Sequence, residues 1–234
     1  MTLHILSAGA AKAVVNTLAE TFTREERVAV AAVFNAAGTI RAQFVAGEPC
    51  DVLILPVAML DALAAERRID ASTHASLGLV PTGVAVAAGV PAPQIGDAAA
   101  TRSAFENASA IYCPDTQRST AGLHVVRVLH EMGIHASIAA RIRDYANGAQ
   151  AMAALAALDT DRERAIGCTQ VTEILYTPGV TLVGVLPPPF ELTTVYSVAV
   201  SSQSRHPERA RRFAALVSGP HSEALRVESG FAQR

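Results

Sequence analysis

Short apolar runs rich in β-branched residues alternate along this chain with alanine-rich segments of helical period, and the alternation occurs twice. In the first half we predict strands at residues 3–6, 28–34 and 51–55, and helices at 10–23, 39–46 and 56–67. Strand–helix repeats of this kind are typical of an α/β fold, in which helices flank a mainly parallel sheet.

A second repeat follows a loop with two prolines at residues 89–96. We predict strands at 110–113, 141–145, 164–168 and 180–186, with helices at 120–132 and 148–158. A strand-like stretch at 80–88 leaves the first half, and a strand at 192–200 returns to it before terminal helices at 207–217 and 222–227. The pattern therefore predicts two lobes joined by two crossover strands, residues 1–80 plus 192–234 and residues 81–191. A cleft between such lobes is the natural place for a ligand.

Five turns follow the carboxyl ends of the predicted parallel strands, at residues 7–9, 35–38, 115–121, 146–148 and 169–170. They collect small and hydroxyl residues beside helix N-termini, which present free N–H groups and partial positive charge. We therefore predict a small anion held largely by main-chain donors. The ligand-binding residues predicted from these turns are Ser7, Gly9, Asn35, Ala36, Ala37, Thr39, Arg118, Ser119, Thr120, Ala121, Asn147, Gly148, Thr169 and Gln170.

Several of these residues also have a purely structural interpretation. Ser119 and Thr120 are typical N-cap residues, and Asn35 and Thr39 also suit a cap. Arg118 has the two-pronged geometry that clamps a carboxylate, although a solvated surface arginine is the alternative. Both interpretations remain open at this level.

Lys12 lies in the first turn of a predicted helix, where a cation opposes the helix dipole. This conflict makes Lys12 a candidate for pairing with an anionic ligand. Lys12 is also the one lysine among the 19 basic residues, so the sequence disfavours Schiff-base chemistry and pyridoxal-phosphate enzymes.

Two residues are candidates for moving a proton. His124 lies one turn into the helix that begins near Ser119, and imidazole suits acid–base work at neutral pH. Cys168 directly precedes the predicted ligand segment and would carry a proton if its pKa were lowered. The structural alternatives are a hydrogen-bonded histidine on a helix flank and an inert buried cysteine. The other histidines share no spacing with carboxylates, so we predict no metal site.

Composition and missing motifs exclude several function classes. The net charge is −2, with 19 basic and 21 acidic residues, so nucleic acid is not an expected partner. P-loop, GxGxxG, GxSxG and HExxH patterns are absent, and we predict no cofactor. The three cysteines lie more than fifty residues apart, which favours neither disulfides nor zinc.

The N-terminal residues and the hydropathy of the sequence give an expectation about where the protein is located. No apolar run is long enough to span a bilayer, so we expect a protein that is not embedded in a membrane. Without a basic, apolar leader at the N-terminus, we expect a cytoplasmic protein. A trimmed leader would leave the same sequence and indicate the periplasm instead.

Several sequence blocks together resemble a known family. They are LHILSAGAAKAV, VFNAAGTIRAQFVAGEPCDVLILP, IYCPDTQRSTAGLHVVRVLHEMGI, AIGCTQVTEIL with PGVTLVGVLP, and the closing Gly230–Phe231. In order and spacing they resemble the bacterial periplasmic solute-binding proteins of the molybdate-binding type. The stretches from SAIYCPD to TAGLH and from AIGCTQVTEIL to GVTLVGVLP look closer to the branch that includes aconitate isomerase. The resemblance covers nearly the whole chain. It implies a type II periplasmic-binding-protein fold, with two lobes that close on a ligand.

The resemblance also implies where this chain departs from molybdate binders. Those proteins hold the oxyanion with two serines, and the matching positions here are Ala10 and either Ala36 or Ala37. Ala10 therefore joins the predicted ligand contacts, but two lost hydroxyl donors disfavour molybdate. Thr169 and Gln170 match the pocket wall of the family, with a structural turn as the alternative.

The function that the resemblance implies is binding of a small organic anion, a di- or tricarboxylate. We expect the protein to isomerise that anion by proton transfer without a cofactor. The alternative is a non-catalytic solute-binding protein for molybdate-like oxyanions, or another small anion, that works with an ABC permease. A ligand-sensing domain is a third option, and a homo-oligomer is compatible with the sequence.

Overall fold

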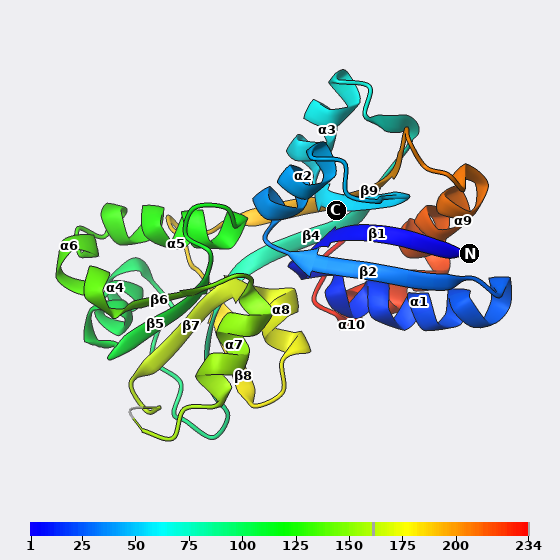
Figure 1. Cartoon of the computed structure of the whole chain (residues 1–234). Coiled ribbons are helices and arrows are strands. Elements are labelled where there is room, and N and C mark those ends of the chain that lie inside the picture. Colours follow the sequence, from blue (N-terminus) through cyan, green and yellow to red (C-terminus); the bar gives the residue numbers. More distant parts are fainter. Residues whose placement is uncertain (161, 234) are drawn as a thin grey trace. The chain divides into compact units, whose positions relative to one another are not determined.

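The computed structural model describes residues 1–160 and 162–233 (Figure 1). It divides into two compact units, Met1–Val80 with Thr194–Arg234 and Pro81–Thr193. The chain passes between them within β4 (Ile69–Ala87) and at the start of β9 (Thr193–Ser201). Within the described ranges, none of the helices has the length and apolar character needed to cross a bilayer.

Unit 1 contains a sheet with the strand order β2-β1-β3-β9-β4, in which β4 contributes its first part. Strand β1 pairs in parallel with β2 and β3, and β9 is antiparallel to β3. The other elements of unit 1 are β1 (Thr2–Ala8), η1 (Gly9–Ala11), α1 (Lys12–Glu26), β2 (Ala29–Asn35), α2 (Ala37–Val45), β3 (Val52–Pro56), α3 (Val57–Ala65), α9 (Pro207–Ser218), η3 (Pro220–Ser222) and α10 (Glu223–Glu228).

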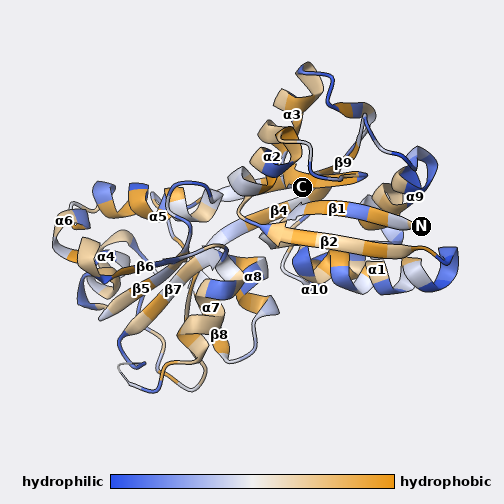
Figure 2. Ribbon diagram, in the orientation of Figure 1, coloured by the Kyte–Doolittle hydropathy of each residue, from blue (hydrophilic) through white to orange (hydrophobic). Residues whose placement is uncertain are grey.

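Burial on both sides of the sheet explains the apolar character of its central strands. All five residues of β3 are buried, as expected for a strand covered on both faces. Helices α1 and α9 meet through the rings of Phe22 and Phe213, whose centroids are 5.2 Å apart in an edge-to-face arrangement. Figure 2 shows the hydrophobic residues along β1, β2 and β9.

Unit 2 contains the strand order β4-β7-β5-β6, and β8 pairs with β4. Strand β5 is parallel to β6 and β7, whereas β4 is antiparallel to β7 and β8. Two apolar clusters form its core, one containing residues of α5 and the other residues of α7. Its further elements are α4 (Ala98–Asn107), β5 (Ala110–Pro114), α5 (Thr120–Glu131), α6 (His135–Ile138), η2 (Ala139–Arg141), β6 (Ile142–Tyr145), α7 (Gly148–Ala156), β7 (Ala165–Gln170), α8 (Val171–Tyr176) and β8 (Val180–Val185).

The structure confirms the predicted α/β class with helix-flanked sheets and adds elements that the pattern does not predict. Strand β4 begins at Ile69, whereas we predicted a strand only from residue 80. The polar residues in its first half give neither an alternating nor a continuous apolar pattern. Helix α4 also lies outside the predicted elements, and the Asp97 side chain caps it by accepting from the Ala100 N–H. We predicted neither α6 nor α8, which are only four and six residues long.

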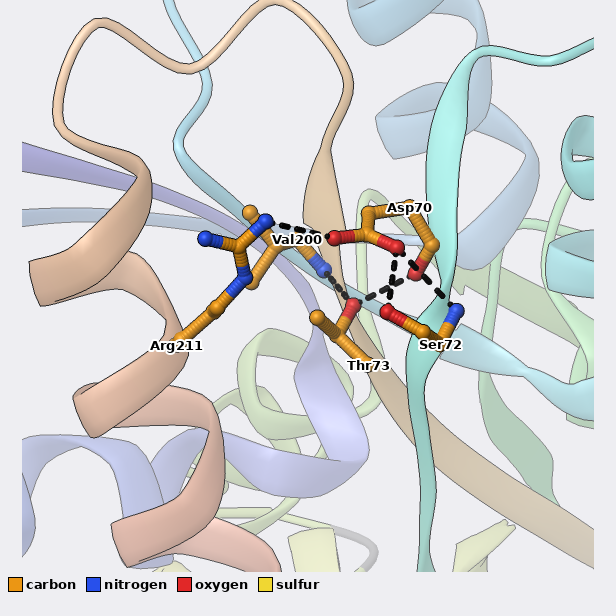
Figure 3. A network of polar contacts seen from close by, with 5 residues as sticks. All are labelled: Asp70, Ser72, Thr73, Val200 and Arg211. Carbon is orange, nitrogen blue, oxygen red and sulfur yellow. Dashed lines mark hydrogen bonds and ion pairs between the residues drawn. The ribbon is translucent and has the colours of Figure 1, made fainter.

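A polar network explains how the first half of β4 is held (Figure 3). The Asp70 carboxylate accepts from the Ser72 N–H and hydroxyl, at 3.1 and 2.6 Å, and pairs with Arg211 of α9 at 2.9 Å. The Thr73 hydroxyl donates to the Asp70 carbonyl at 2.6 Å and accepts from the Val200 N–H of β9 at 2.9 Å. Side-chain contacts thus tie the polar start of β4 to β9 and α9.

Asp70 predicts a pH dependence of stability. The hydrogen bonds from Ser72, followed by those from Arg211, lower the pKa of Asp70 below its ordinary value of 3.8. The lowered pKa stabilises the fold above the ordinary pKa, and this stabilisation is lost as the pH falls through the folded-state pKa. We expect Asp70→Asn to lower the urea midpoint at pH 7 and the difference from wild type to shrink below about pH 4. The exposed Asp159→Asn serves as the control, and a difference that persists unchanged at pH 3 would contradict the assignment.

Candidate functional site

The end of β1 leads into a helix start whose first residues are small and buried. Ala10 and Ala11 are 4% and 0% exposed, and the described chain supplies no side-chain cap to η1 or α1. The first N–H groups of such a turn have no acceptor within the helix. Ser7 is fully buried, and its hydroxyl donates to the Ala8 carbonyl at 2.9 Å, so its donor is used within the chain in this structure.

The second helix of unit 1 starts in the same way and in the same place. Ala8 lies opposite Asn35 in the parallel β1–β2 register, so α2 begins beside η1. Ala36 and Ala37 are each 5% exposed, and α2 has no side-chain cap from the described residues. The Asn35 side chain accepts from the N–H of Ala36 at 2.9 Å.

Lys12 belongs to the same group of residues. Its Nζ lies 5.9 Å from the centroid of the Phe34 ring, within the range of a cation–π contact. Phe34 directly precedes Asn35 at the end of β2, so the lysine lies near the start of α2 as well as in α1. Thr39 is half-buried in the first turn of α2. Unit 1 thus brings together most of the predicted residues of its two turns, namely Gly9, Ala10, Lys12, Asn35, Ala36, Ala37 and Thr39.

In unit 2, a compact loop positions the start of α5. The Asp115 carboxylate accepts from the backbone N–H groups of Gln117 and Arg118 at 2.8 and 2.9 Å. Ser119 caps α5 by accepting from the Gly122 N–H at 2.9 Å, so the structural interpretation of Ser119 holds, although its hydroxyl can still donate. A Cβ on Gly122 would lie 2.2 Å from the Asp115 carbonyl oxygen, so glycine is needed where α5 packs on the loop.

The first-turn residues of α5 complete this corner. The N–H groups of Thr120 and Ala121 lie in the first turn of the helix and have no intrahelical acceptor. The Arg118 side chain is exposed. This corner of unit 2 therefore keeps the donors that we predicted for an anion.

The start of α7 is occupied by a carboxylate of the chain itself. Glu173, in the first turn of α8, is 5% exposed, and its Oε1 accepts from the Gly148 N–H at 3.1 Å. Its Oε2 accepts from the Thr169 hydroxyl at 2.6 Å, and Thr169 is fully buried. A Cβ at Gly148 would lie 2.0 Å from Glu173 Oε2. Asn147 caps α7 by accepting from the Gln150 N–H at 3.0 Å.

This arrangement gives three of the predicted ligand contacts partners within the chain. Asn147 caps α7, and Glu173 accepts from both Gly148 and Thr169, which favours a structural role for all three residues. We did not predict Glu173. The sequence feature that could have led to it is the one acidic residue in the otherwise uncharged segment AIGCTQVTEIL. A glutamate in a buried segment needs hydrogen-bond donors around it, so such a residue indicates a buried polar contact.

Two buried hydroxyls flank the junction of β7 and α8. Among residues 1–160 and 162–233, Thr82 Oγ1 and Thr172 Oγ1 have no hydrogen-bond partner, and both residues are at most 2% exposed. Thr82 lies opposite Gln170 in the β4–β7 register, and Thr172 follows Gln170 by two positions. Buried polar groups are normally paired, so unpaired hydroxyls at this junction require an explanation. We did not predict either residue.

His124 is a structural residue. It is 4% exposed, and its Nε2 lies 2.8 Å from the Phe190 carbonyl oxygen, which can only accept. Burial lowers the pKa of His124, so the neutral imidazole donates from Nε2 and joins α5 to the turn at Phe190. The proton on Nε2 is already used and the side chain is buried, which favours the structural interpretation of His124 over a role as a proton carrier.

Cys168 is likewise inert. The residue is fully buried in β7, and desolvation, with Cys113 nearby, raises the pKa of its thiol far above the usual range. Burial also raises the pKa of Cys113 to about 12. A fully buried thiol with a raised pKa favours the alternative of an inert buried cysteine over a proton carrier.

Comparison with known proteins shows the family of this chain. The family model described as "Bacterial extracellular solute-binding protein" matches residues 3–232. The chain belongs to this family. The solute-binding protein is also 27% identical over 235 residues to aconitate isomerase from a Pseudomonas species, covering 98% of this chain and 87% of that protein.

Solved structures share the fold of the solute-binding protein. The periplasmic molybdate-binding protein of Azotobacter vinelandii superposes with a TM-score of 0.80 at 19% identity, with 99% of each chain covered. The sulfate-binding protein SubI of Mycobacterium tuberculosis gives a TM-score of 0.75 at 15% identity, covering 99% of this chain and 86% of that one. At these identities the likeness shows the fold.

The Glu173 cluster predicts a large effect on the stability of the solute-binding protein. We expect Glu173→Ala to lower the free energy of unfolding by about 2–4 kcal/mol, because the Gly148 N–H and the Thr169 hydroxyl lose their buried acceptor. Glu173→Gln keeps one acceptor oxygen and should cost less. Urea unfolding checks both, with Glu131→Ala, which removes an exposed pair with Arg127, as a control expected to change little. Equal stability of the two alanine variants would contradict the buried acceptor role.

Proposed function

We propose that this protein binds a small organic anion with several carboxylates and isomerises it by proton transfer. The observation that carries the binding part is the pair of adjacent helix starts in unit 1. Both begin with buried alanines, neither has a side-chain cap within the described chain, and Lys12 lies beside them. Buried N–H groups at helix starts need acceptors, and an anionic ligand supplies them.

The side chains at these helix starts favour carboxylates over tetrahedral oxyanions. Ala10, Ala36 and Ala37 offer no hydroxyl donors, so a tetrahedral oxyanion would receive main-chain hydrogen bonds alone from these positions. A carboxylate has fewer oxygens to satisfy, and a lysine ammonium pairs readily with it. A ligand with several carboxylates would use Lys12 and the main-chain donors at the two helix starts of unit 1.

The similarity to aconitate isomerase supports the isomerisation part, because it extends over 98% of this chain. In such a reaction a base removes a proton from the carbon beside the double bond. The electron pair moves the double bond by one position, and a proton returns to its far end. No electrons are gained or lost, so the step needs no redox cofactor. The proposal uses neither His124 nor Cys168, because the neutral imidazole of His124 already donates to the Phe190 carbonyl and the Cys168 thiol is fully buried.

A ligand screen tests this function. Thermal unfolding is compared with citrate, cis- and trans-aconitate, molybdate, tungstate and sulfate. A ligand at a hundred times its Kd stabilises the fold by about 2.7 kcal/mol and raises the midpoint by about 5–10 °C. We expect this shift with a polycarboxylate, followed by isomerisation and deuterium uptake in heavy water by NMR. A shift with molybdate or sulfate alone would contradict the proposal. A polycarboxylate shift without turnover would refute the isomerase part and leave a non-catalytic binding protein.

Lys12 gives a matched pair of variants for the same screen. We expect Lys12→Gln to weaken polycarboxylate binding at least tenfold, because the ammonium is replaced by a neutral amide. Arg24→Gln removes an exposed cation from the other end of α1 and should leave the affinity unchanged. Equal losses in the two variants would indicate a general charge effect and contradict a direct role of Lys12.

Thr172 tests whether the unpaired hydroxyls of unit 2 contact a ligand. Thr172→Val removes a buried hydroxyl that has no partner in the described chain, so we expect the ligand-free protein to become more stable by about 1 kcal/mol. If the hydroxyl donates to the ligand, the same variant binds polycarboxylate more weakly, so stability and affinity change in opposite directions. Calorimetry and thermal unfolding measure the two effects. Unchanged affinity would remove Thr172 from the site.

A further inference from the structure

Unit 1 has a pocket at the other edge of its sheet. A cavity of about 490 Å³ lies where β1 and β3 begin, whereas η1 and α2 start where β1 and β2 end. This volume is within the usual range for small-molecule sites. The cavity shares no lining residue with the predicted ligand contacts. Its walls are Thr2, His4, Phe44, Gly47, Glu48, Pro49, Cys50, Asp51, Arg68, Ser201, Gln203, Arg205 and His206.

A buried carboxylate holds the walls of this pocket together. Asp51 is 4% exposed, and its Oδ2 accepts from the His4 N–H at 2.8 Å. Its Oδ1 accepts from the Ser204 hydroxyl at 2.6 Å, which joins the loop between β9 and α9 to the start of β3. The backbone of that loop is also fixed, because the Ser202 N–H donates to the Arg68 carbonyl at 3.0 Å. The pocket is therefore preorganised by contacts between distant parts of the chain.

The groups left to face a ligand are basic. Both oxygens of Asp51 already accept hydrogen bonds from the chain. Arg68 uses its Nε for Glu66 at 3.1 Å, which leaves its terminal nitrogens, and the described residues give Arg205 no side-chain partner. Guanidinium groups recognise phosphate and carboxylate oxygens through paired N–H donors. The other acidic residue that lines the pocket is Glu48, whose side chain is exposed to solvent.

A metal ion does not suit this pocket. Within the described residues, no three histidine, cysteine, aspartate or glutamate side chains form a group that could hold a metal. Burial raises the pKa of Cys50 to about 12, and its protonated thiol donates to the Val52 carbonyl at 3.3 Å. A thiol in this state is a poor metal ligand.

We propose that the pocket between β1, β3 and the β9–α9 loop is a second binding site, for a small anion that carries at least two negative charges. Arg68 and Arg205 bind its oxygens, and Asp51 positions the walls without contacting it. The site is independent of the proposed function, because its residues lie at the opposite edge of the sheet from Lys12 and the two helix starts.

Titration of the full chain with inorganic pyrophosphate tests the site. We expect amide NMR shifts at His4, Asp51 and Ser201, with a Kd below 1 mM. Arg205→Gln and Arg68→Gln should each weaken binding at least tenfold, whereas Arg24→Gln and Lys12→Gln should not. Thermal unfolding without ligand confirms that each variant is folded.

A parallel titration with propane-1,2,3-tricarboxylate separates the two sources of such an anion. Tighter binding of pyrophosphate at the pocket amides indicates a phosphoryl ligand, and tighter binding of the tricarboxylate indicates a carboxylate ligand. Shifts confined to the amides near Ala10 and Ala37 with both probes would overturn the second site. Equal affinities of Arg205→Gln and Arg24→Gln would also overturn it, and neither result would contradict the proposed function.

Discussion

The parallel pairing of β1 with β2 is the constraint on which the candidate site depends. The register sets Ala8 opposite Asn35, so the helices that follow the two strands begin side by side. Because neither start has a side-chain cap within the described chain, their first N–H groups collect at one edge of the sheet. A shift of the register by one residue would move Leu3 and Ile5 out of the core, so the core fixes the site.

In unit 2, the two helix starts that follow parallel strands have different roles. At the start of α5 the serine cap leaves donors for a ligand, whereas at the start of α7 the buried Glu173 accepts the donors itself. A buried carboxylate is stable only when donors surround it, so Glu173 fixes the end of β7 against the start of α7. One helix start is therefore open to binding, and the other has become part of the structure.

The opposite edge of unit 1 shows how a second buried carboxylate can shape a pocket. Asp51, like Glu173, accepts two hydrogen bonds from the chain, and both of its donors are distant in the sequence. The hydrogen bonds of Asp51 hold the walls of a cavity that is lined by two arginines. Glu173 instead packs so closely against Gly148 that a Cβ would not fit there. The surrounding side chains decide which of these outcomes a buried carboxylate produces.

The sequence by itself determined the α/β class and most strands and helices, because apolar period and alanine-rich segments depend on local residues. It also predicted helix starts at Ala10, Thr39 and Thr120, each within two residues of the start that the structure shows. It did not reveal the first half of β4, whose polar residues are held by Asp70 and Thr73 through contacts with β9 and α9. Only the tertiary structure decided that His124 and Cys168 are inert and that Glu173 occupies the start of α7. These properties arise from burial and from partners that lie 25 to 66 residues away along the chain, as in the bonds of Gly148 to Glu173 and of His124 to Phe190.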